Sequence, residues 1–126
     1  MAELNTILHV DDDEDILEIT RMALQLVDSF DLHQCLRTAD ALAAVPRVKP
    51  DLLLLDYMMP EMSGPELWAA VRQVPGFETV PAIFMTAKAE DRIYSELRDA
   101  GALDVVTKPF DPMTLGAHIR SVWAAR

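Results

Sequence analysis

The feature that most constrains the fold is a run of four leucines at positions 52–55, which ends at Asp56. An antiparallel strand with one wet face would alternate apolar and polar residues, so an unbroken apolar run favours a strand buried on both faces of a parallel sheet. Open parallel sheets bind ligands at the carboxyl ends of their strands. Aspartate is also common in turns, so Asp56 considered alone is better explained as a turn residue.

Composition and charge limit the class of protein. The chain has 126 residues, 51% of them apolar, which suits one packed domain over residues 1–126. A net charge of −10 argues against nonspecific binding to nucleic acid or anionic membranes and suits a cation or a basic partner. Cys35 is the only cysteine, which excludes an intramolecular disulfide and fits a reducing cytoplasm. No signal-peptide pattern and no membrane-length apolar run is evident.

Five short apolar segments alternate with helical patterns along the chain. We predict strands at 4–10, 30–36, 51–55, 82–85 and 103–106. The segment 30–36 has mixed polarity, so we expect it at an edge of the sheet. Helices are predicted at 16–27, 39–45, 64–73, 90–100 and 112–124. Five strand–helix repeats indicate an α/β fold with a parallel sheet and right-handed crossovers.

Three of these helices carry expectations about single residues. The first is expected to turn one set of residues inward: Ile16, Ile19, Ala23 and Val27. Thr38 is expected to cap the second helix and Pro46 to end it. The fourth has a thin apolar face, typical of a weakly anchored helix that can shift or bind: Ile93, Leu97 and Ala100.

Polar groups stand at the ends of four of the five predicted strands. They are the pair Asp11 and Asp12, then Asp56, Thr86 and Lys108. Because the carboxyl ends of parallel strands share one edge, these side chains should meet in space. Clustered carboxylates repel, and one would be driven to take a proton unless a divalent cation bound there. Hard oxygen ligands with room for water fit Mg²⁺.

In order and spacing, these residues resemble the receiver domain of two-component response regulators over essentially the whole chain. That family has an acidic pair after the first strand, Asp after the third, Thr after the fourth and Lys-Pro after the fifth. The resemblance implies a flavodoxin-like (βα)5 three-layer sandwich with strand order 2-1-3-4-5. It also implies that Asp56 accepts a phosphoryl group, and that no independent substrate is turned over as in an enzyme.

The resemblance assigns a metal set at this edge. Asp12 and Asp56 would ligate Mg²⁺ (or Mn²⁺) directly, Asp11 would act through water, and the backbone carbonyl of Met58 would complete the protein ligands. The metal would attract a phosphate and screen the acidic groups from it.

Lys108 and Thr86 are the expected phosphoryl-binding groups. The Lys108 ammonium can bind a phosphoryl oxygen as a point charge, and it can pair with Asp56 before phosphorylation. The Thr86 hydroxyl can donate to another phosphoryl oxygen. By resemblance, the peptide bond between Lys108 and Pro109 is cis.

The sequence departs from many receivers at the position three before the lysine. There the family often has an aromatic switch residue, whereas this chain has Val105. We therefore hypothesise that Thr86 and residues 87–90 carry the signal into helix 90–100 and shift the conformation of residues 86–110.

Met58 and Lys88 lie two residues beyond Asp56 and Thr86. By resemblance, these positions flank the path of the attacking water and tune dephosphorylation. Met58 offers no polar group to orient that water, whereas Lys88 could bind near the phosphoryl group. This combination predicts slow autodephosphorylation.

The resemblance also implies partners. They are a sensor histidine kinase or histidine phosphotransfer protein, and a downstream effector protein or an output domain. A homodimer would use the usual family face, formed by the last two helices and the strand between them. Direct binding to nucleic acid or to a membrane is not expected.

Other classes remain as alternatives. A haloacid-dehalogenase-type phosphatase also uses a strand-end aspartate with Mg²⁺, but it normally has a second aspartate where this chain has Met58. A flavin-binding electron carrier would need a phosphate loop where residues 11–15 are all acidic. A receiver-like interaction module that is never phosphorylated is disfavoured by the intact acidic pair, Asp56, Thr86 and Lys108.

Overall fold

A five-stranded parallel sheet is the centre of the protein, whose computed structural model describes residues 3–87 and 90–126. The strands are β1 (Thr6–Val10), β2 (Asp31–Cys35), β3 (Leu52–Asp56), β4 (Ala82–Thr86) and β5 (Asp104–Thr107). Their order is β2-β1-β3-β4-β5, which confirms the expected topology and the edge position of residues 31–35. Every residue of the central strand β3 is buried, as the leucine run predicts.

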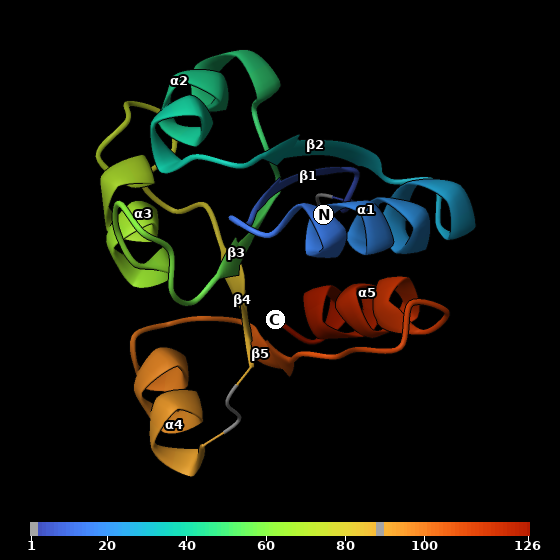
Figure 1. Cartoon of the computed structure of the whole chain (residues 1–126). Coiled ribbons are helices and arrows are strands. Elements are labelled where there is room, and N and C mark those ends of the chain that lie inside the picture. Colours follow the sequence, from blue (N-terminus) through green and yellow to red (C-terminus); the bar gives the residue numbers. More distant parts are fainter. Residues whose placement is uncertain (1–2, 88–89) are drawn as a thin grey trace.

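Helices cover both faces of the sheet (Figure 1). On one face lie α2 (Thr38–Val48), α3 (Gly64–Val71) and α4 (Asp91–Asp99); on the other lie α1 (Glu14–Arg21), the π-helix η1 (Met22–Val27) and α5 (Leu115–Ala125). Because alternate residues of a strand point to opposite faces, Leu53 and Leu55 pack in the core beneath α2, α3 and α4. Leu52 and Leu54 pack in the second core, beneath α1 and α5.

Trp68 of α3 is buried in the first of these cores. Its indole N–H donates to the Val80 carbonyl at 2.9 Å, which satisfies the polar atom of an otherwise apolar ring. The ring meets Phe84 edge-on, with centroids 5.8 Å apart and planes at 69°. Trp68 therefore packs between the segment just before β4 and the middle of that strand, whose last residue is Thr86.

The first helix differs from the prediction in its inward face. Ile19 is 39% exposed and Val27 is 50% exposed, whereas Ala23 is buried as expected. The chain changes from an α-helix to the π-helix η1 at Met22. Because a π-helix bonds i to i+5, Val27 at its end leaves the 3.6-residue spacing on which the prediction depends. Ile19 precedes this change, so the π-helix does not explain its exposure.

The ends of the second helix were predicted wrongly. Thr38 is buried and is the first residue of α2, with Arg37 at the cap position and no side-chain cap bond. Pro46 lies exposed within α2, which ends where Lys49 adopts φ 54° and its N–H donates to the Val45 carbonyl at 2.8 Å. An internal proline removes one backbone donor and crowds the carbonyl four residues earlier, so the packing of the buried face, which includes Val45, carries the helix past it.

The last two helices differ at their ends. Ile93 and Leu97 are buried as expected, but Ala100 is the exposed cap residue after α4. In α5, Leu115 and Ile119 are buried. This helix begins three residues later than predicted, because residues 112–114 form a turn in which the Asp111 carbonyl accepts the Leu115 N–H at 3.1 Å.

Candidate functional site

Three carboxylates gather at the carboxyl edge of the sheet. Asp11 and Asp12 follow β1, and Asp56 is the last residue of the adjacent parallel strand β3. One carboxylate oxygen of each residue lies within 4.8 Å of the others. Asp11 and Asp56 are buried and Asp12 is exposed. The convergence predicted from the strand ends is therefore present.

Lys108 connects two of these carboxylates. Its Nζ donates to Asp11 Oδ2 at 2.8 Å and to Asp56 Oδ1 at 3.0 Å, and its side chain is only 14% exposed. The pairing with Asp56 was expected, whereas the pairing with Asp11 was not. The Lys108–Pro109 peptide bond is cis, as the resemblance implies. The backbone N–H of Lys108 donates to the Thr86 carbonyl at 2.8 Å, which holds the ends of β4 and β5 together.

The electrostatics of the cluster are dominated by burial. Burial raises the pKa of Asp56 to about 6 against the opposing hydrogen bond from Lys108, and the charge of Asp11 adds to the rise. Burial also raises the pKa of Asp11. Burial alone would lower the pKa of Lys108, but its hydrogen bonds to Asp11 and Asp56 outweigh this and the pKa is raised. The single positive charge of Lys108 does not balance the three carboxylates. Their hard oxygen donors fit Mg²⁺, which would supply the missing positive charge.

An open hollow of about 540 Å³ adjoins the carboxylates. Its walls include Asp56, Met58, Thr86 and Lys108, together with residues near the start of α4. Thr86 is buried at the end of β4, and the Met58 side chain is exposed. The strand ends therefore bring the predicted phosphoacceptor, hydroxyl and ammonium groups to one hollow, and Asp11 and Asp12 lie beside Asp56.

Among the predicted site residues that the structure describes, Asp11, Asp12 and Val105 do not line this hollow. Val105 is half-buried in β5 and packs against the core beneath α2, α3 and α4. Its position holds no aromatic ring, so the aromatic switch found in many receivers has no counterpart here. Lys88 lies outside the described residues.

Gly64 supports the site in a way that the sequence analysis did not identify. A Cβ at this position would lie 2.4 Å from the Asp56 carbonyl oxygen and 3.0 Å from the Phe84 ring. The Gly64 N–H donates to the Tyr57 carbonyl at 2.8 Å. The glycine therefore lets the start of α3 approach the backbone of Asp56. The Gly64-Pro65 pair signals a turn and a helix start, but it gives no sign of this close approach.

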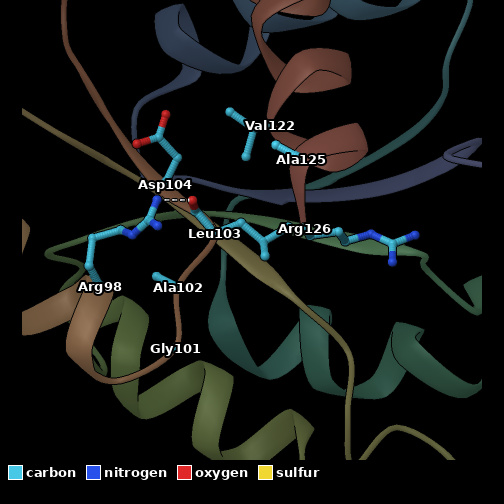
Figure 2. A pocket seen from close by; sticks show the side chains of 8 residues that line it. All are labelled: Arg98, Gly101, Ala102, Leu103, Asp104, Val122, Ala125 and Arg126. Atoms are coloured by element: carbon cyan, nitrogen blue, oxygen red, sulfur yellow. Dashed lines mark hydrogen bonds between the residues drawn. The ribbon is translucent and has the colours of Figure 1, made fainter.

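A second hollow, of about 420 Å³, lies where β5 begins (Figure 2). It is lined by residues of α4, β5 and α5, and the Arg98 guanidinium donates to the Leu103 carbonyl at its edge. His118 Nε2 lies 2.7 Å from Asp104 Oδ2 beside it. In the described ranges, the only acidic cluster able to hold a metal is that of Asp11, Asp12 and Asp56. We therefore place the candidate site at the carboxyl edge.

A doubly wound α/β protein with an acidic cluster, a hydroxyl and a lysine at this edge is built to bind a cation together with an anion. The chain belongs to the response regulator receiver domain family, which matches residues 7–120. It is thus a receiver domain of the kind found in two-component response regulators. Domains of this family are signalling domains rather than classical enzymes, and they interact with histidine kinases and effector domains.

Individual relatives agree with this assignment. The chain is 37% identical to the phosphate regulon transcriptional regulatory protein PhoB of Pseudomonas aeruginosa, over 93% of this chain and 51% of that protein. It is 36% identical to the DNA-binding response regulator MtrA of Mycolicibacterium smegmatis, over 91% of this chain and 49% of that protein. The chain therefore spans about half the length of these curated relatives. Their names are those of response regulators, so the haloacid-dehalogenase alternative is not supported.

Solved structures match the chain over nearly their whole length. The chemotaxis protein CheY4 of Vibrio cholerae has 27% identity and a TM-score of 0.84, covering 95% of this chain and 99% of that one. A BeF3-activated DrrB receiver domain has 28% identity and a TM-score of 0.80, covering 97% and 99%. Across the residues that the structure describes, no helix is long and apolar enough to cross a membrane.

Proposed function

We propose that residues 1–126 act as a single receiver domain in which Asp56 accepts a phosphoryl group from a phosphohistidine of a sensor kinase or phosphotransfer protein. The observation that carries this proposal is the shared hydrogen bonding of Lys108 to Asp11 and Asp56 beside a third carboxylate. Such an arrangement offers a nucleophile, a cation and a metal-binding group within one hollow. The domain would act in the cytoplasm.

Asp11, Asp12 and Asp56, with the Met58 carbonyl, are the groups that we propose to hold Mg²⁺ (or Mn²⁺). The donors are hard oxygens, and Asp12 is exposed, so a hydrated metal ion can reach it. Bound Mg²⁺ would supply positive charge against the carboxylates and the phosphoryl oxygens.

The residues then have distinct tasks in phosphoryl transfer. A carboxylate oxygen of Asp56 forms a bond to phosphorus while the P–N bond to the donor imidazole breaks, and the departing imidazole takes up a proton. Lys108 exchanges a carboxylate partner for a phosphoryl oxygen, and Thr86 donates its hydroxyl to another. Hydrolysis of the resulting acyl phosphate by water regenerates Asp56, so the domain catalyses only its own phosphorylation and dephosphorylation.

The signal would leave through Thr86 and the segment that leads into α4. Helix α4 buries only Ile93 and Leu97 among its residues, so few apolar contacts oppose its displacement. The output surface would be α4, β5 and α5, which is available to an effector protein, an output domain or a second copy of the chain. Neither nucleic acid nor a membrane is a proposed direct partner of this domain.

The test is incubation with acetyl phosphate or phosphoramidate plus Mg²⁺, followed by intact mass spectrometry. We expect a phosphate-sized mass gain that is absent from Asp56→Ala. The matched control is Asp99→Ala, which removes an exposed carboxylate at the far end of α4 and should keep the gain. An equal mass gain in Asp56→Ala, or none in the unaltered protein at any Mg²⁺ concentration, would reject the proposal.

A further inference from the structure

Met58 places an exposed thioether in the wall of the hollow that holds Asp56, Thr86 and Lys108. Its side chain is 65% exposed, although the next methionine along the chain, Met59, is buried. A thioether sulfur is a weak hydrogen-bond acceptor and has no donor. The hollow therefore has a chemically modifiable, weakly polar side chain next to the proposed phosphoacceptor.

We propose that Met58 is an oxidation site, and that its sulfoxide shortens the lifetime of the phosphoryl group on Asp56; this inference rests on the proposed function. The oxidant is a peroxide. One oxygen atom of hydrogen peroxide bonds to the Met58 sulfur as the O–O bond breaks, sulfur loses two electrons, and the other oxygen leaves as water. Sulfoxide reductases reverse the change, with one enzyme for each sulfoxide epimer.

Exposure makes the reaction selective among the methionines of the described chain. Met113 is 70% exposed and Met22 is 48% exposed, whereas Met59 is 8% exposed and Met85 is fully buried. Peroxide oxidises accessible thioethers first, so Met58 and Met113 should react before Met59 and Met85. Met113 lies in the turn before α5 and does not line the hollow. Its oxidation therefore serves as a control for sulfoxide formation away from Asp56.

The effect on lifetime follows from the change in polarity. Hydrolysis of the acyl phosphate requires a water molecule in line with the bond between phosphorus and Asp56. Asp56 lines the hollow, so we expect this water to approach through it. The thioether of Met58 binds such a water weakly, whereas the sulfoxide oxygen is a strong acceptor. We expect oxidation at Met58 to speed phosphoryl loss roughly fivefold, the effect of one added hydrogen bond.

The experiment compares phosphoryl lifetimes before and after brief peroxide treatment. Peptide mass mapping gives the sulfoxide content at each methionine, and loss of the phosphate-sized mass gives the lifetime. We measure the unaltered protein, Met58→Leu and Met113→Leu, each against its own untreated sample. Acceleration in the unaltered protein and in Met113→Leu, its absence in Met58→Leu, and its reversal by sulfoxide reductase are the expected results.

Two outcomes overturn the inference: an unchanged lifetime when Met58 is fully oxidised, or the same acceleration in Met58→Leu. The untreated samples test the proposed function separately, because a protein that gains no phosphate before oxidation contradicts the role of Asp56 itself.

Discussion

Replacing Asp56 with asparagine should stabilise the metal-free protein near neutral pH. In the folded chain, burial raises the pKa of this carboxyl from 3.8 to about 6. Each pKa unit corresponds to about 1.4 kcal/mol, so the ionised form is disfavoured in the folded state by about 3 kcal/mol. Asparagine has nearly the same shape, stays neutral and can still accept the Lys108 hydrogen bond. We therefore expect the free energy of unfolding to rise by up to about 3 kcal/mol.

The pH dependence of this gain has a definite sign. The pKa of Asp56 is higher in the folded than in the unfolded chain, so the folded state binds the proton more tightly. The unaltered protein loses stability as the pH rises through the interval from 3.8 to about 6, and its stability is not recovered above that interval. The advantage of Asp56→Asn should therefore be small at about pH 4 and complete above about pH 6.

Urea unfolding in the presence of a chelator, followed by far-UV circular dichroism, measures the effect. The control is Glu18→Gln, which removes one exposed charge from the middle of α1 and should change stability by less than about 0.5 kcal/mol. A destabilised Asp56→Asn variant at neutral pH would show that the ion pair with Lys108 outweighs burial, and the electrostatic reasoning would then be wrong.

Three further predictions concern the same edge of the sheet. Millimolar Mg²⁺ should raise the thermal midpoint of the unaltered protein and raise it much less in Asp12→Asn, as scanning calorimetry can check; equal shifts would place the cation elsewhere. Gly64→Ala should cost about 1–3 kcal/mol in urea unfolding, because the new methyl group would overlap the Asp56 carbonyl and the Phe84 ring; an unchanged midpoint would contradict the close approach. Beryllofluoride with Mg²⁺ should move the backbone NMR resonances of residues 86–100, and unmoved resonances would refute the route through Thr86.

The sheet and the site were predictable because strand periodicity and strand ends are local properties of the sequence. Four consecutive leucines require burial on both faces, and the parallel sheet then brings Asp11, Asp56 and Lys108 to one edge. The shared pairing of Lys108 was harder to foresee, because it depends on how far one flexible side chain reaches between two strands.

Local irregularities could not be predicted because tertiary packing decides them. The π-helix η1 changes which residues of the first helix face inward, and nothing in an apolar 3.6-residue pattern signals a wider turn. Pro46 in α2 shows the same limit, since a local preference for ending a helix is overcome by the burial of Val45 and its neighbours.

Trp68 gives the domain a built-in fluorescent reporter. Its indole is held between the Val80 carbonyl and the edge of Phe84, so emission from this ring depends on the position of the strand that ends at Thr86. The second tryptophan, Trp123, lies in α5, on the opposite side of the sheet. A Trp123→Phe variant would isolate the Trp68 signal, and a change in its quenching on addition of beryllofluoride would report altered packing of this ring against Phe84 without any attached dye.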